Sequence, residues 1–173
     1  MSTQPTAIHP ETRIGHVHLK VADLDRAIAF YHDVLGFELM QRYGRQAAFL
    51  SAGGYHHHIG LNTWESRGGP RPAPGTTGLY HVAILYPNRR ELARALRRLL
   101  DNGIPLAGAA DHGVSEAIYL EDPDGNGLEL YADRAHADWP IDANGEIAMV
   151  TEPLDFAGLL AELENEPPGN ADR

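Results

Sequence analysis

The stretch His112–Glu129 combines a histidine, a tyrosine, a tight turn and a carboxylate. A β-rich run, turn residues at 122–126 and a return strand predict a β-hairpin. Leu128 and Leu130 face one side of the return strand, so Glu129 faces the other. A carboxylate directed inward is costly unless a positive partner meets it, and a metal ion is one such partner. Glu129 is therefore a candidate metal ligand.

Two histidines occupy equivalent positions in an internal repeat. His16 precedes a predicted helix cap, Asp23, by seven residues, and His81 precedes a second cap, Asn88, by the same seven. Each half of the repeat predicts a βαβββ unit, and two such units can pack around a shared concave centre. We therefore expect His16, His81 and Glu129 to converge there. Two imidazoles and a carboxylate suit non-haem Fe(II) oxygenases, but zinc hydrolases use them too, so the ligand types leave the reaction open.

The elements that must position these residues follow from the hydrophobic pattern. Helices are expected after the caps Asp23 and Asn88, ending at Gly36 and Gly103. Strands are expected at 14–21, 37–42, 46–51, 55–64, 79–85, 104–106, 116–120 and 128–131. The fold class is α+β, with two tandem βαβββ modules that form a shared concave mixed sheet.

The chain divides at composition changes. We expect a flexible lead-in at 1–12, a first module at 13–65, a Pro/Gly-rich linker at 66–78 and a second module at 79–133. An arm at 134–173 follows, with a short helix near 154–163 and a disordered end. We expect the arm to pack on the module or on a partner subunit.

Composition excludes several classes of function. The 173 residues include 14 Lys and Arg, 24 Asp and Glu and no cysteine, and the net charge is −10. This charge argues against nucleic acid and anionic membrane partners, and the missing cysteines exclude disulfides and thiolate sites. The sequence shows neither a signal peptide nor an apolar run that could span a membrane. We expect a cytoplasmic, soluble protein.

The doubled pattern, with HVHLKVADLDRAIAFYHDVLGFEL opening the first half and YHVAI the second, resembles the vicinal oxygen chelate superfamily. Within it, residues 13–133 resemble the type I extradiol dioxygenases, the catechol 2,3-dioxygenase group. The tail MVTEPLDFAGLLAEL also resembles a catechol-2,3-dioxygenase-like subgroup. The ring-cleavage motif of that group corresponds here to His112, Ile118-Tyr119, Asp122-Pro123, Gly125 and Glu129, and Ala110 is one departure from it.

The resemblance implies a role for each matching residue. His16, His81 and Glu129 match the iron ligands, His57 matches the acid–base histidine of the pocket, and His112 and Tyr119 match residues that support the ligands and the substrate. Within the run 56–58, strand alternation places His57 opposite its neighbours, and a bulge could change which of the three enters the pocket. Phe49 and Trp64 are interpreted as core, His9, His18, His32 and His136 as structural or exposed, and 122–126 as a turn only.

The resemblance implies Fe(II), with Mn(II) possible, and an aromatic diol and O2 as substrates of a homo-oligomer. A metal-dependent lyase or transferase and a non-catalytic binding module are the alternatives. Glyoxalase I has a fourth ligand, a glutamate, where this chain has Gly60. The fosfomycin-modifying relatives have a basic cluster that we do not find here. The bleomycin-sequestering relatives need no metal site, so the complete ligand set argues against them.

Overall fold

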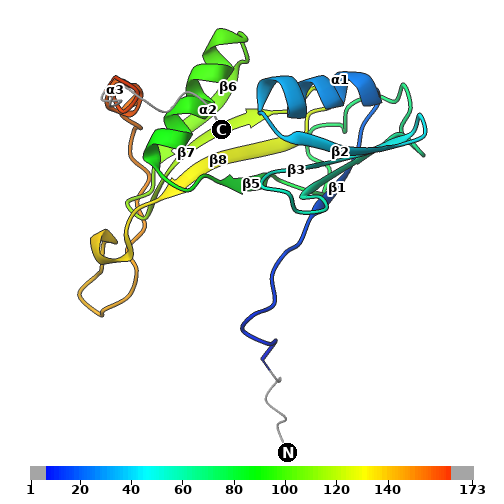
Figure 1. Cartoon of the computed structure of the whole chain (residues 1–173). Coiled ribbons are helices and arrows are strands. Elements are labelled where there is room, and N and C mark those ends of the chain that lie inside the picture. Colours follow the sequence, from blue (N-terminus) through cyan, green and yellow to red (C-terminus); the bar gives the residue numbers. More distant parts are fainter. Residues whose placement is uncertain (1–6, 165–173) are drawn as a thin grey trace, which may run out of the picture.

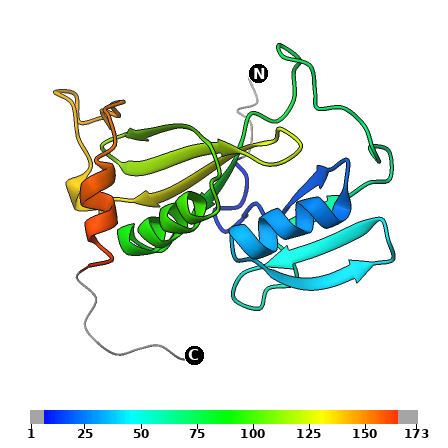
Figure 2. The ribbon, with the colours of Figure 1, turned by 90° about the horizontal axis from the view of Figure 1, so that it is seen from above.

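The computed structural model describes residues 7–164, which form two mixed four-stranded sheets and short helices (Figure 1). This arrangement confirms the predicted α+β fold. The two long helical segments lie on the same side of the sheets (Figures 1 and 2). Residues 1–6 of the predicted lead-in and the predicted disordered end after residue 164 fall outside the described range. Within that range, no helix combines the length and apolarity needed to cross a membrane.

The first sheet has the strand order β1-β4-β3-β2, in which β1 runs parallel to β4. The Asp23 side chain accepts from the Arg26 N–H at 3.0 Å and so begins the helix, and Gly36, at φ +88°, follows its end. The helix is π-helical in its second half. The elements are β1 (Val17–Lys20), α1 (Leu24–Ile28), η1 (Ala29–Val34), β2 (Glu38–Tyr43), β3 (Ala47–Ser51) and β4 (Ile59–Asn62).

The second sheet repeats this topology in the order β5-β8-β7-β6, with β5 parallel to β8. Asn88 caps α2 by accepting from the Glu91 N–H at 3.0 Å, as the sequence predicts. The β7–β8 hairpin is also present. The elements are β5 (Val82–Leu85), α2 (Arg89–Asp101), β6 (Leu106–Asp111), β7 (Ser115–Glu121) and β8 (Gly127–Asp133).

One apolar core joins the two halves. It contains Leu24 and Tyr31 from the first helical segment, Leu96 from α2, and Leu61 and Leu130 from β4 and β8, all at most 5% exposed. Because these side chains fill one face of each sheet, the polar residues of β1 and β8 are left on the opposite face. That opposite face carries the candidate site.

The turn between β7 and β8 docks onto the first half of the chain. The Tyr31 hydroxyl donates to Asp122 Oδ2 at 3.0 Å. Asp124 Oδ1 accepts from the Ala22 N–H at 3.0 Å and from Arg26 Nη2 at 2.6 Å. Both carboxylates are buried, and burial together with Asp122 raises the pKa of Tyr31 well above its usual range. The interpretation of 122–126 as a turn only is therefore incomplete, because it also joins the halves.

The first and second sheets remain separate at their facing edges. Among the described residues, the pairings of β1 and β5 are with β4 and β8, and none joins β1 to β5. A largely apolar cavity of about 450 Å³ lies between these two edges, with His16 and His58 on one side and Ala83 and Leu85 on the other. The two modules therefore contribute two separate sheets rather than one continuous sheet.

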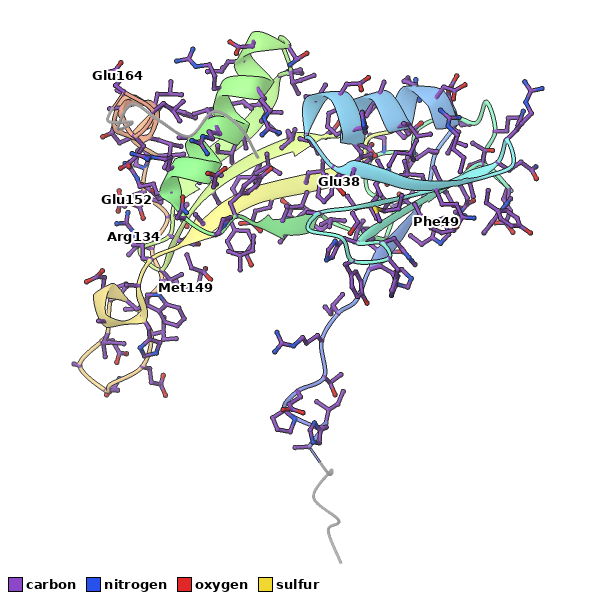
Figure 3. All side chains as sticks on the ribbon, in the orientation of Figure 1. Glu38, Phe49, Arg134, Met149, Glu152 and Glu164 are labelled. Carbon is purple, nitrogen blue, oxygen red and sulfur yellow. The ribbon has the colours of Figure 1, made fainter. Side chains whose placement is uncertain are left out.

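The arm packs on the second half of the same chain. It contains η2 (His136–Asp138), a bridge between Ile141 and Ile147, and α3 (Phe156–Ala161), which contacts α2 (Figures 1 and 2). A second bridge joins Asp111 to Glu152. Glu152, Arg134 and Met149 are labelled along this segment in Figure 3. The predicted short helix is present, although it begins two residues later than expected.

Candidate functional site

His81 and Glu129 are brought together by the parallel pairing of β5 with β8. Ala83 lies beside Glu129 in this ladder, and His81 lies just ahead of β5. His81 Nε2 is 3.1 Å from Glu129 Oε2, and the side chains are 31% and 15% exposed. Two of the three predicted ligands thus present donor atoms at one point that remains accessible to a small ion.

Tyr119 and His112 extend this pair into a chain of contacts. Tyr119 lies directly opposite Glu129 in the β7–β8 ladder, and its hydroxyl donates to Glu129 Oε1 at 2.9 Å. His112 Nε2 is 2.7 Å from the same hydroxyl. Burial, and next the bond to Glu129, raise the pKa of Tyr119 to about 12. Tyr119 therefore keeps its proton at neutral pH and acts as a donor to the Glu129 carboxylate.

The C-terminal arm adds a further contact, to His112, at the end of this series of hydrogen bonds. His112 Nδ1 lies 2.9 Å from the carbonyl oxygen of Val150, and the Val150 N–H donates to the His112 carbonyl at 3.1 Å. A carbonyl only accepts, so His112 Nδ1 carries a hydrogen in this bond. The arm therefore orients the His112 ring, whose Nε2 stays beside the Tyr119 hydroxyl.

His16 lies on the first sheet and contacts His57. Their ring centroids are 4.4 Å apart, and Phe49 packs on the other side of His57 at 5.0 Å. Burial, followed by the charge of His16, lowers the pKa of His57. His58 instead meets Ser51 Oγ at 3.0 Å through Nδ1. The structure thus places His57, among the three neighbouring histidines, against the predicted ligand.

The run 56–58 does not form part of a strand, because β4 begins only at Ile59. The alternation rule used for this run therefore does not apply to it. His56 stacks on Tyr55 at 4.0 Å between centroids, and its Nδ1 lies 2.7 Å from Nδ1 of His57. The irregular backbone lets consecutive histidines take different environments.

The structure does not bring His16 to the other two predicted ligands. Within residues 7–164, no group of three or more His, Asp or Glu side chains is placed to hold a metal ion. The convergence of His16, His81 and Glu129 therefore remains a prediction. The donor types do fit an iron ion, because His81 and Glu129 already meet at 3.1 Å and Glu129 is oriented by Tyr119.

Sequence reasoning missed two parts of this surface. His18 is exposed, as the sequence predicts, and it lies on the same face of β1 as His16. Its ring lies 5.5 Å from Trp64 and 6.0 Å from Phe49 between centroids. Trp64 is 53% exposed and so is not core. The contact from Val150 is made by a backbone carbonyl, which has no sequence signal.

Comparison with known proteins places the chain in a family. The family model described as the Glyoxalase/Bleomycin resistance protein/Dioxygenase superfamily matches residues 13–130. The chain belongs to this superfamily. Its second sheet, with the His81–Glu129 pair, and its first sheet, with His16, are the two repeated units that the superfamily match covers almost completely.

Relatives of this superfamily member include several enzymes. Over 161 residues the chain is 45% identical to a catechol-2,3-dioxygenase of Bacillus subtilis (strain 168), covering 93% of this chain and 55% of the relative. It is 34% identical over 122 residues to biphenyl-2,3-diol 1,2-dioxygenase 3 of Rhodococcus globerulus, covering 70% and 63%. A crystal structure of a lactoylglutathione lyase from Agrobacterium tumefaciens has 26% identity and a TM-score of 0.56, covering 72% and 96%. The chain thus spans between half and two thirds of the two dioxygenases.

Proposed function

We propose that this chain is an extradiol dioxygenase that uses Fe(II) to insert both atoms of O2 into the ring of a catechol-type substrate. The observation that carries the proposal is the chain of contacts from His81 through Glu129 and Tyr119 to His112. The 45% identity to a catechol-2,3-dioxygenase supports it. We further propose that the protein acts in the cytoplasm as a homo-oligomer.

His16, His81 and Glu129 would hold the ion. Bound iron supplies the spin-allowed route by which O2 reacts with an aromatic diol, and Mn(II) accepts the same donor types. His16 lies just ahead of β1 in the first sheet and the His81–Glu129 pair belongs to the second, so one ion held by all three would join the two sheets.

His57 would manage the substrate proton. Its pKa is lowered by burial and by His16, so its ring is neutral near pH 7 and can accept a hydrogen from a diol hydroxyl as a general base. The contact with His16 holds it beside the proposed ligand set. Later in the cycle His57 would return the proton to an oxygen of the product.

Tyr119 and His112 would fix the geometry of the ligand and the substrate. Tyr119 donates to one oxygen of Glu129, which leaves the other oxygen, beside His81, directed at the ion site. His112 is held in turn by Val150 and contacts the Tyr119 hydroxyl. We expect Tyr119 and His112 together to hold the substrate hydroxyl and the negative charge that develops on it.

The lactoylglutathione lyase neighbours make a metal-dependent lyase the main alternative. The position that would supply the fourth ligand of such a lyase is Gly60, and the ring of His18 lies over it. A side chain at position 60 would meet His18 at 2.9 Å, which disfavours a fourth carboxylate there. A non-catalytic binding module is the third reading, and the hydrogen-bonded support of Glu129 disfavours it.

Oxygen uptake tests the proposal. The protein is reconstituted anaerobically with Fe(II), freed of excess metal, and mixed with catechol and air while O2 and the product spectrum are recorded. Uptake of one O2 per diol with a yellow ring-opened product supports extradiol cleavage. Bound iron without uptake across several catechols favours the lyase alternative, and failure to bind iron removes the proposed site.

Two variants separate the roles within the site. Glu129→Ala should abolish both iron binding and turnover, and full activity in this variant would remove Glu129 from the ligand set. His57→Phe should retain iron but slow the reaction by about 10²–10⁴-fold, the usual contribution of a general base. His32→Phe is the matched control, because His32 is exposed and pairs with Asp33 away from the site. Equal rates in the His57 and His32 variants would move the base to His56 or His58.

A further inference from the structure

One buried carboxylate outside the site, that of Glu116 on β7, is approached by two arginines. The Glu116 side chain is only 8% exposed. Strand alternation places it on the same face as the core residue Ile118, opposite the face that carries Tyr119. Arg89 Nε donates to Glu116 Oε2 at 2.6 Å, and Arg134 Nη2 lies 3.6 Å from Glu116 Oε1. A buried carboxylate is costly without positive partners, so Glu116 depends on these two arginines.

The two arginines connect Glu116 to opposite ends of the C-terminal arm. Arg134 is the first residue of the arm and is labelled in Figure 3. Arg89 belongs to α2, beside which α3 packs at the far end of the arm (Figure 2). Arg89 Nη1 donates there to the Gly158 carbonyl at 3.0 Å and to Glu162 Oε1 at 2.8 Å. The arm is therefore closed into a loop whose two ends meet at one carboxylate.

Arg134 also holds the turn that carries His112. Asp111 lies directly opposite Glu116 in the β6–β7 ladder, and like charges at such positions repel each other. Arg134 Nη2 donates to Asp111 Oδ2 and so places a positive charge between the two carboxylates. Asp111 Oδ1 accepts from the Gly113 N–H at 2.8 Å. One oxygen of Asp111 thus binds the arm, and the other fixes the turn that begins with His112.

The middle of the arm pairs with the same turn. Asp111 and Glu152 exchange two backbone hydrogen bonds, at 2.8 and 2.9 Å. The Val150 carbonyl, two residues earlier, lies 2.9 Å from His112 Nδ1. Because the loop is closed at Glu116, the ion pairs on one face of the sheet set the position of a carbonyl that orients a ring on the other.

We propose that Glu116 and Arg134 are positioning residues of the site. Their ion pair holds the arm against the second sheet and thereby fixes the ring of His112 beside the Tyr119 hydroxyl. They act through His112 rather than by touching the substrate. The kinetic consequence rests on the proposed function, because that function gives His112 its place beside the substrate. The orientation of the His112 ring can be measured without any reaction.

Nitrogen-15 NMR of the histidine rings tests the proposal on the full chain without added metal. At about pH 8, above the ordinary titration range of histidine, His112 should show a protonated Nδ1, because that atom donates to the Val150 carbonyl. In Arg134→Gln this signal should move toward the average of the two neutral tautomers. Arg42→Gln is the matched control, because Arg42 pairs with Asp25 on the first half of the chain and is 44% exposed, against 39% for Arg134. An unchanged His112 signal in Arg134→Gln, or an equal change in both variants, would overturn the proposal.

Kinetics of O2 uptake with catechol provide the second readout. Arg134→Gln should lower kcat by about 10-fold and leave KM unchanged, which is the low end of the effect of groups that orient a ligand. Arg134→Lys keeps the positive charge and should recover most of the rate, and Glu116→Gln should resemble Arg134→Gln. A normal kcat in Arg134→Gln, or an equal loss in the Lys variant, would overturn the positioning role and leave the dioxygenase proposal intact. An unsubstituted protein without O2 uptake would overturn the dioxygenase proposal, and the NMR comparison would still decide the role of Glu116 and Arg134.

Discussion

Replacement of Tyr119 by Phe removes the hydroxyl that connects Glu129 to His112. The phenyl ring keeps its packing, but Glu129 Oε1 loses a donor at 2.9 Å and His112 Nε2 loses its partner at 2.7 Å. Groups that hydrogen-bond a metal ligand typically account for about 10–100-fold in metal affinity. We therefore expect Tyr119→Phe to bind a divalent metal about 10–100-fold more weakly, which is a loss of about 1.4–2.7 kcal/mol of binding free energy.

Competition with a chromophoric chelator under anaerobic conditions measures this difference directly, and it requires no turnover. Tyr43→Phe is the matched control, because its hydroxyl lies on the first sheet and the residue is 65% exposed. The pKa of Tyr119 is about 12, so its proton remains in place and the ratio of the two affinities should be constant between about pH 6 and pH 9. An affinity equal to that of the control would refute the donor role of Tyr119. A ratio of affinities that falls to one within this pH range would refute it as well.

Two further substitutions test how the site is held. Tyr31→Phe should lower the free energy of unfolding in urea by about 1.5–3 kcal/mol, because the buried hydroxyl donates to the carboxylate of the β7–β8 turn. Because folding raises the pKa of Tyr31, the contribution of its hydroxyl to stability is complete below about pH 10 and is lost as the pH rises above that value. The free energy of unfolding of the intact protein should therefore fall at alkaline pH, while that of Tyr31→Phe should change less. An equal slope in both proteins would contradict this. Gly113→Ala and Gly145→Ala both introduce a side chain at positive φ, at a cost of about 1–2 kcal/mol, but only at position 113 would the β-carbon press on the arm. Only Gly113→Ala should therefore shift the NMR signals of the His112 ring nitrogens, and identical spectra in the two variants would show that the arm does not position His112.

Local signals explain why most of the elements could be predicted. Helix caps act within one turn, so Asp23 and Asn88 mark helix starts that the structure confirms. Strand ends were less accurate, and the strand expected at 55–64 is only Ile59–Asn62. The reason is that a ladder ends where its partner strand ends, which local composition does not specify.

Sequence reasoning could anticipate those neighbours that strand pairing alone brings together. The parallel pairing of β5 with β8 follows from the repeat and places His81 beside Glu129. It left open the approach of His16, because that distance depends on how two separate sheets pack across a cavity. It also left open the choice of His57, because an irregular backbone has no side-chain periodicity.

The sequence by itself determined the repeated units, their caps, the inward direction of Glu129 and the motif that includes Tyr119, because these depend on residue types at short spacing. The tertiary structure alone decided the contacts between distant segments. The turn at 122–126 reaches Tyr31, the arm places the Val150 carbonyl on His112, and Gly60 gives space to a neighbouring ring. Each of these contacts depends on backbone atoms or on buried partners far along the chain, and their identity is fixed only when the two sheets pack together.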